Sequence, residues 1–198
     1  MEGEKTLRAF LAIELPAEIL GEIGRFQGHL QRLVHGELRW VRPEGIHLTL
    51  KFFGSIAEEA VPAIAAVVEK VAARARPFSL AVGGIGVFPD KRRPRVLWVG
   101  MSGDVERLAG FQQQLEEALM ALDYPVEERP FRPHLTLARF RSPKDLTGLP
   151  KALEKGENFA AGSFLAAGIG LIKSELKPQG AVYTRLKWFP FAGTVGGD

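Results

Sequence analysis

The sequence predicts an α+β fold of two lobes, on the basis of three observations. The tetrapeptide His-Leu-Thr-Leu occurs twice, at residues 47–50 and 134–137. Each copy falls in its own half of the 198-residue chain, within a strand-like segment. A strand–helix–strand–helix–strand order recurs in both halves, with no long linker between them. We therefore expect one domain over residues 1–198, with two pseudo-symmetric antiparallel sheets, helices on their outer faces and a central cleft.

The first half begins with a strand and an amphipathic helix. Residues 6–15 are apolar and end before Pro16, which suits the first position of a helix. Apolar residues then recur with helical spacing over 17–33. The other elements expected in this half are strands at 38–41 and 46–53, a helix opened by a capping box at 55–58, and strands at 78–87 and 95–101.

The second half repeats this order. An apolar stripe predicts a helix over 104–122, and a strand carrying the second tetrapeptide follows. Ser142 and Pro143 offer a cap and a proline start for a short helix. Strands at 164–174 and 181–188 are then expected to form a hairpin, because the intervening Lys-Pro-Gln-Gly has proline second and glycine fourth, as in a type I turn.

Composition restricts the functional classes. The chain has no cysteine, which excludes disulfides, thiolate metal sites and cysteine nucleophiles. No apolar run approaches the ~20 residues that span a membrane, and the first residues lack the pattern of a secretory signal. We therefore expect a cytoplasmic protein without a membrane partner. A net charge of +3 permits an anionic substrate without demanding a long nucleic-acid track.

The repeated tetrapeptide places two polar side chains on one strand face. Alternate residues of a strand share a face, so His47 lies beside Thr49 and His134 beside Thr136, while the leucines face the core. Imidazoles with a usual pKa near ~6.5 can supply a base and an acid near neutral pH. Threonine hydroxyls can donate hydrogen bonds to phosphate oxygens. An isolated His-x-Thr is more often structural, but two identical copies favour a catalytic pair.

A metal site is not expected in either motif. Catalytic zinc takes about three protein ligands, and neither tetrapeptide contains a carboxylate to complete a histidine pair. The sequence therefore favours phosphodiester chemistry with neither a metal nor a cofactor.

Further segments match a known family over nearly the whole chain. They are Arg8-Ala9-Phe10-Leu11-Ala12, Leu15-Pro16, Trp40, Lys51-Phe52-Phe53-Gly54, Gly86-Val87-Phe88-Pro89, Arg95-Val96-Leu97-Trp98, Phe131-Arg132-Pro133, Ala138-Arg139, Ser174-Glu175-Leu176, Gly180 and Tyr183. With both tetrapeptides, the chain resembles the 2H phosphoesterase superfamily, named for two H-x-[ST]-x motifs. Within it, the chain is similar to the RNA 2′,3′-cyclic phosphodiesterases, historically called 2′-5′ RNA ligases.

The resemblance implies a reaction and a set of partners. It implies hydrolysis of a terminal ribose 2′,3′-cyclic phosphate to a 2′-phosphate, with weak reverse 2′,5′ joining in some members. It also implies that His47 gives a proton to the departing 3′ oxygen and that His134 takes one from water. The two identical motifs cannot make that assignment by themselves. The expected partners are RNA ends or short oligonucleotides with a 2′,3′-cyclic phosphate. The protein itself is expected to be a monomer.

Three further residues are candidates for substrate binding. Arg139 follows His134 by five positions, an odd offset that puts it on the opposite face unless a bulge or the strand end reorients it. The resemblance implies that it reaches the phosphate region. Lys51 has an even offset from His47 and is expected on its face, at the site or its rim. Tyr183 offers a hydroxyl. Candidates with weaker signals are the basic turn at 91–95 and the possible base-stacking residues Phe52, Phe88, Phe131 and Phe140.

Two alternatives stay open at this point. The same cleft could bind a nucleotide monophosphate or an RNA end without turnover, although binding alone needs no paired acid and base. The protein could also be a phosphodiesterase for 2′,5′-oligoadenylate or a small cyclic nucleotide. The sequence alone separates these alternatives poorly.

Overall fold

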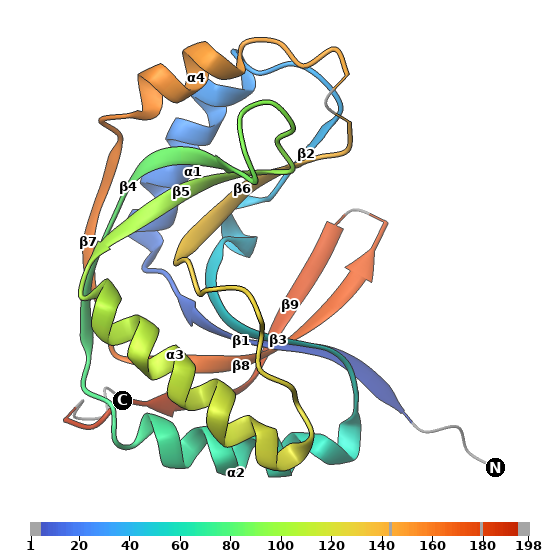
Figure 1. Ribbon diagram of the computed structural model, residues 1–198, viewed down its shortest axis with the longest axis vertical. Helices are drawn as coiled ribbons and strands as arrows, with labels where there is room; N and C mark the ends of the chain where they lie inside the picture. Colours follow the sequence, from blue (N-terminus) through green and yellow to red (C-terminus); the bar gives the residue numbers. More distant parts are fainter. Residues whose placement is uncertain (1–4, 143, 179, 194–198) are drawn as a thin grey trace.

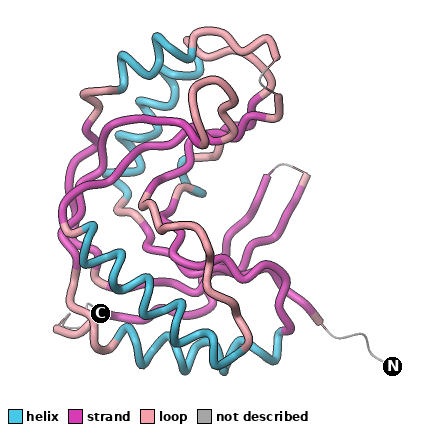
Figure 2. Tube along the Cα trace, in the orientation of Figure 1, coloured by secondary structure: helices cyan, strands magenta, loops and turns pink. Residues whose placement is uncertain are grey.

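Two antiparallel sheets form the framework of the protein in a computed structural model, which describes residues 5–142, 144–178 and 180–193 (Figure 1). The four-stranded sheet has the order β3-β1-β8-β9, and the five-stranded sheet has the order β2-β6-β5-β4-β7. Helices cover the outer faces of both sheets, as Figure 2 shows. These features confirm the predicted two-lobed α+β fold.

The strands of each sheet come from distant parts of the chain. The four-stranded sheet contains β1 (Thr6–Glu14), β3 (His47–Ala57), β8 (Gly168–Lys177) and β9 (Gly180–Pro190). The five-stranded sheet contains β2 (Leu38–Trp40), β4 (Phe78–Phe88), β5 (Val96–Gly103), β6 (His134–Phe140) and β7 (Ala160–Ala166). The sheets therefore do not follow the two halves of the sequence, because the last hairpin joins the first strand and β2 joins the second motif strand.

Helices pack through apolar stripes against the two sheets. They are α1 (Ala17–Gln31), α2 (Val61–Ala72), α3 (Val105–Leu119) and α4 (Leu149–Gly156), with short 3-10 turns η1 (Pro43–Gly45), η2 (Glu58–Ala60) and η3 (Met120–Leu122). Helices α2 and α3 contact the four-stranded sheet, whereas α1 and α4 contact the five-stranded sheet (Figure 1). In α1 the buried positions Ile19, Ile23, Gln27 and Leu30 recur with helical spacing. None of the helices in the described ranges is long and apolar enough to cross a membrane.

Two predicted helix starts differ from the structure. The prediction that a capping box at 55–58 opens a helix is wrong. Strand β3 continues to Ala57, paired with β1, and α2 begins at Val61 without a side-chain cap. The short helix expected from Ser142 begins instead at Leu149, after Gly148 with a φ of 75°. Pro143, which was part of that prediction, lies outside the described residues.

The predicted last hairpin is present, but the segment predicted as its first strand is divided between two strands. Residues 164–174 belong partly to β7 and partly to β8, because the chain passes from one sheet to the other around Ala167. Strands β8 and β9 pair up to Lys177 and Gly180, as a tight turn requires. Gln179 of that turn lies outside the described residues.

Candidate active site

The two tetrapeptides open two strands that meet where the sheets join. His47 is the first residue of β3, and His134 is the first residue of β6. Strands β3 and β6 contact each other although they belong to different sheets (Figure 1). We call this region the junction. Both histidines are half-buried there, while Thr136 is half-buried and Thr49 is exposed.

Each imidazole is fixed by the backbone two residues before it. Nδ1 of His134 lies 2.7 Å from the carbonyl oxygen of Arg132, and the ring of His47 bonds to the backbone of Gly45. When Nδ1 donates to a carbonyl, Nε2 becomes the atom that exchanges protons. For His134 the geometry therefore fixes which ring nitrogen is available to a reacting group.

Aromatic rings surround both histidines. Phe10 stacks on His47 with 4.4 Å between ring centroids, and Tyr183 approaches His47 edge-on at 5.2 Å. Phe88 approaches His134 edge-on at 5.0 Å. These rings remove water from the imidazoles and hold their orientation. Sequence reasoning missed this role of Phe10, because nothing in the pattern of the first strand distinguishes it from a core residue.

The surroundings lower the pKa of both histidines. Burial lowers the pKa of His47 to about 4, the bond to Gly45 acts in the opposite direction, and the charge of Arg139 adds to the decrease. Burial and then Arg139 also lower the pKa of His134, against the effect of its bond to Arg132. Both rings are therefore neutral near pH 7 in the free protein. The same arginine contributes to the decrease at both rings, and the strands that begin with the two histidines contact each other, so both motifs belong to one region.

Both motif strands contain a β-bulge at the fourth residue of the tetrapeptide. In the β1–β3 pair, Leu11 lies opposite Lys51 and Ala12 opposite Thr49, so no residue of β1 lies opposite Leu50. In the β5–β6 pair, Leu137 is skipped in the same way. A bulge inserts one extra residue and reverses the alternation of faces beyond it. Side chains after the fourth residue therefore exchange faces in both motifs.

The bulge brings Arg139 to the face of His134 in spite of its odd offset. Leu137 and Ala138 are both buried, and Arg139 is exposed again. Burial is the main cause of the lowered pKa of both imidazoles, and the charge of Arg139 adds to the decrease. The sequence allowed this change of face through a bulge or through the end of the strand, and the structure shows a bulge.

The bulge at Leu50 puts Lys51 on the face opposite to that of His47. The prediction that these two side chains share a face is therefore wrong. Lys51 is only 8% exposed, and its Nζ lies 2.5 Å from Oε2 of Glu116 and 2.5 Å from the carbonyl oxygen of Pro125. The ammonium group links β3 to α3 and to the segment that leads to the second motif. Lys51 is therefore occupied within the fold and is not expected to bind substrate.

Two buried glutamines bond to the carbonyl groups of the bulged leucines. Gln27 of α1 donates from Nε2 to Leu137 at 3.0 Å, and Gln112 of α3 donates from Nε2 to Leu50 at 3.1 Å. A bulge frees backbone groups from the sheet, and a buried carbonyl without a partner costs free energy. Sequence reasoning missed both glutamines. The available signal was a polar residue inside the apolar stripe of a helix.

The weaker candidates differ in their surroundings. Phe52 is 52% exposed with the Arg8 guanidinium 5.4 Å from its ring centre, so it is free to contact a ligand. Phe131 and Phe140 are half-buried against the main core. In the basic turn, the backbone amides of Arg92 and Arg93 donate to the carboxylate of Asp90, which explains the shape of the turn without a ligand.

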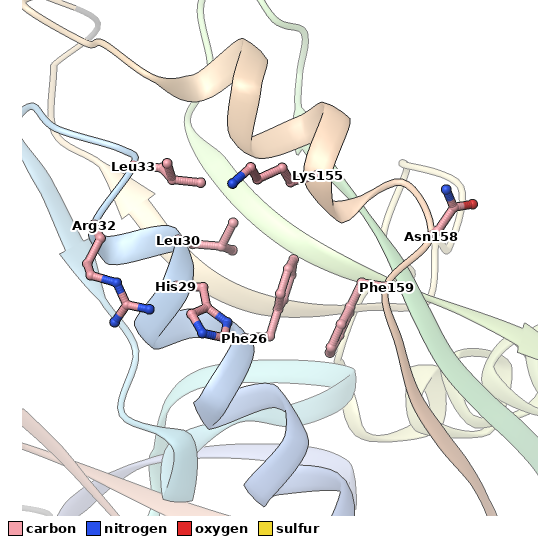
Figure 3. A pocket seen from close by; sticks show the side chains of 8 residues that line it. All are labelled: Phe26, His29, Leu30, Arg32, Leu33, Lys155, Asn158 and Phe159. Carbon is pink, nitrogen blue, oxygen red and sulfur yellow. The ribbon is translucent and has the colours of Figure 1, made fainter.

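In the described part of the chain, no metal cluster includes the histidines, and the hollow shown in Figure 3 is lined by other residues. Among the residues that the structure describes, no group of three or more His, Asp or Glu side chains could hold a metal ion. A hollow of about 530 Å³ lies beside α1 and residues 155–159, as Figure 3 shows, and stacked Phe26 and Phe159 form part of its wall. Its basic residues His29 and Lys155 lie in the last turns of α1 and α4, and Arg32 directly follows α1, where cations are favoured.

Comparisons with known proteins show the family of the chain. The model of a family described as LigT-like phosphoesterase matches residues 13–98 and again residues 99–183, so each match contains one tetrapeptide. A Methanothermobacter thermautotrophicus protein named RNA 2′,3′-cyclic phosphodiesterase is 32% identical over 183 residues, covering 92% of this chain and 98% of its own. A Thermus thermophilus protein of the same name is 34% identical over 202 residues, covering 96% and 93%.

Solved structures show the same fold. A crystal structure of a Thermus thermophilus protein superposes with a TM-score of 0.73 at 32% identity, covering 96% of this chain and 100% of its own. The E. coli protein LigT in complex with 3′-AMP superposes with a TM-score of 0.76 at 26% identity, covering 94% and 99%.

Proposed function

Because the chain belongs to the family of LigT-like phosphoesterases, we propose that it hydrolyses the 2′,3′-cyclic phosphate at RNA ends to a 2′-phosphate, with His47 and His134 as acid and base. One observation carries the proposal. Two half-buried imidazoles, each fixed by the backbone and each next to a threonine, lie close enough for Arg139 to act on both. This arrangement provides a proton acceptor, a proton donor and a cation for one phosphate.

The proposed reaction is an in-line displacement at phosphorus. Water attacks while the neutral imidazole takes its proton, the bond from phosphorus to the 3′ oxygen breaks, and the protonated imidazole gives its proton to that oxygen. The product is a 2′-phosphate with a free 3′-hydroxyl. Each histidine then holds the proton state that the other had before, and exchange with solvent restores the pair.

The remaining groups at the junction stabilise charge in this proposal. Hydroxyls of Thr49 and Thr136 donate to the non-bridging oxygens, where negative charge increases in the transition state. The Arg139 guanidinium neutralises the same phosphate. In the same proposal Tyr183, whose ring lies edge-on to that of His47, contacts the ribose or the base.

The direction of proton transfer follows the family assignment in this proposal, with His47 as acid and His134 as base. Both imidazoles are neutral near pH 7 in the free protein, so the acid must gain its proton when substrate binds. An anionic phosphate beside an imidazole favours the charged ring and raises its pKa. Substrate binding is thus expected to take up a proton.

A panel of phosphodiesters tests the proposal. RNA ends with a 2′,3′-cyclic phosphate, 3′,5′-cyclic nucleotides and 2′,5′-linked oligoadenylates are compared, and ³¹P NMR locates the product phosphate. The proposal expects turnover of the first class, a 2′-phosphate product and full activity in EDTA. A 3′-phosphate product, or activity that EDTA abolishes and zinc or magnesium restores, would contradict it.

The alternatives predict different results in the same panel. A binding module would retain a nucleotide stoichiometrically without turning over any cyclic phosphate. A phosphodiesterase for oligoadenylate or small cyclic nucleotides would favour the other two classes. Weak reverse 2′,5′ joining, a monomeric state and a cytoplasmic location remain part of the proposal, and the first two can be measured with the purified protein.

A further inference from the structure

Two arginines near the junction have no bonded partner of opposite charge in the part of the chain that the structure describes. Arg39 lies on β2, and Arg42 directly precedes η1. Both side chains are exposed, and neither forms an ion pair or hydrogen bond with any residue of the described ranges. Several other exposed cations of the chain have such partners, for example Arg185 with Glu14 at 2.8 Å.

Arg39 lies directly opposite Arg139 in the β2–β6 pair. Residues directly opposite in antiparallel strands point to the same face, with neighbouring strands roughly 5 Å apart. Because Arg139 shares the face of His134, Arg39 also lies on the face that carries the histidine. Like charges in this arrangement destabilise a sheet. No carboxylate in the described residues bonds to either guanidinium, so the pair fits an anion supplied from outside.

Arg42 meets Arg39 at the tip of the last hairpin. A Cβ atom placed on Gly180 would lie 3.8 Å from Nη2 of Arg39 and 3.9 Å from Nε of Arg42. Both guanidinium groups therefore lie against one point of the β8–β9 turn. Arg42 is also connected to the first motif, because its carbonyl oxygen accepts a hydrogen bond from the amide of Gly45, the residue that fixes His47.

We propose that Arg39 and Arg42 form a second phosphate site, which binds the phosphodiester on the 5′ side of the terminal nucleotide. The inference rests on the proposed function, in which Arg139 neutralises the reacting phosphate. Arg39 stands one strand further along the same face, and a nucleic-acid strand carries its next charge one nucleotide away. The enzyme is then built for oligonucleotide ends rather than for mononucleotides. Guanidinium groups suit this role, since they bind phosphate through charge-assisted hydrogen bonds.

The test compares two substrates and two double variants. The substrates are 2′,3′-cyclic AMP, which lacks a 5′ phosphodiester, and a trinucleotide that ends in a 2′,3′-cyclic phosphate. The double variant R39Q/R42Q is measured against R74Q/R76Q. The control removes the same charge from two exposed arginines in the segment between α2 and β4.

The proposal expects kcat/KM for the trinucleotide to fall at least about tenfold in R39Q/R42Q, as for lost hydrogen bonds to a charged group. Turnover of 2′,3′-cyclic AMP should change less than about twofold. The dependence of log kcat/KM on log salt should weaken by roughly 0.7 per lost phosphate contact. Control R74Q/R76Q should match the wild type on both substrates.

Three results would overturn the second site. They are equal losses on both substrates, no loss on either, or the same loss in the control. Binding of a labelled trinucleotide with a 2′-phosphate end, followed by fluorescence anisotropy, tests the site independently of turnover. If the wild type turned over neither substrate, the proposed function would fail, and the second site would stand or fall on whether R39Q/R42Q weakens this binding.

Discussion

The ring of Phe10 stacks on the imidazole of His47, with centroids 4.4 Å apart and planes inclined by 19°. A stacked ring excludes water from one face of the imidazole, and desolvation disfavours its charged form. This contact helps to explain why burial is the main cause of the lowered pKa of His47, at about 4. Burial acts in the same direction on His134.

The lowered pKa values predict an acidic optimum for kcat/KM, which reports the free enzyme. In the proposed mechanism the active form carries one proton on the histidine pair, so kcat/KM should be greatest between about pH 4 and the usual histidine pKa of ~6.5. Above that range it should fall about tenfold per pH unit. Because bound phosphate raises both pKa values, the kcat optimum should lie at higher pH. Initial rates from pH 4 to 9 measure both, and a kcat/KM optimum above pH 7.5 is incompatible with this account.

Replacing Arg139 should shift this profile. Its charge lowers the pKa of both histidines, so Arg139→Gln should move the kcat/KM optimum to higher pH. The maximal rate should also fall by roughly 10²–10³-fold, as for other groups that stabilise transition-state charge. Arg139→Lys is the matched control, because it keeps the charge and should keep the optimum at a reduced rate. An unchanged optimum in Arg139→Gln would show that this arginine does not act on the histidines.

Gln27 should affect activity through the bulge of the second motif. Gln27→Leu removes the donor to the Leu137 carbonyl, and also the donor to Val41 at 2.7 Å. The free energy of unfolding should fall by about 1–3 kcal/mol. Because the bulge determines the face of Arg139, kcat/KM should also fall while the protein is folded. Gln113→Leu on the exposed side of α3 is the control for denaturant unfolding and kinetics, and full activity in Gln27→Leu would refute the positioning role.

Lys51 should matter for stability and little for turnover. Lys51→Met leaves Glu116 buried without its cation, and loss of one partner of a buried pair costs about 3–5 kcal/mol. At low temperature, where the variant is folded, kcat/KM should stay within a few-fold of the wild type. Lys51→Met/Glu116→Met should recover part of the lost stability. If Lys51→Met melted like the wild type but lost catalysis, this expectation would be wrong, and Lys51 would be a substrate-binding residue.

The sequence was sufficient for features that depend on local pattern. Alternation in a strand predicts Thr49 on the face of His47, and the buried Leu48 between them agrees, because these residues precede the bulge. The same rule failed for Lys51 and depended on a bulge for Arg139, since the bulge lies between each of them and its histidine. Bulges depend on which residues the neighbouring strand and helix present, such as the two buried glutamines. That information comes from distant segments and cannot be derived from local periodicity.

Acid–base catalysis by two histidines is the central claim, and single replacements test it most directly. The measurement is hydrolysis of an RNA trinucleotide with a 2′,3′-cyclic phosphate end by His47→Ala and His134→Ala. Variant His29→Ala, at an exposed position of α1, is the control, and circular dichroism melting checks folding. We expect each active-site variant to melt like the wild type and to lose about 10²–10⁴-fold in kcat. Near wild-type turnover by either folded variant would contradict the two-histidine mechanism.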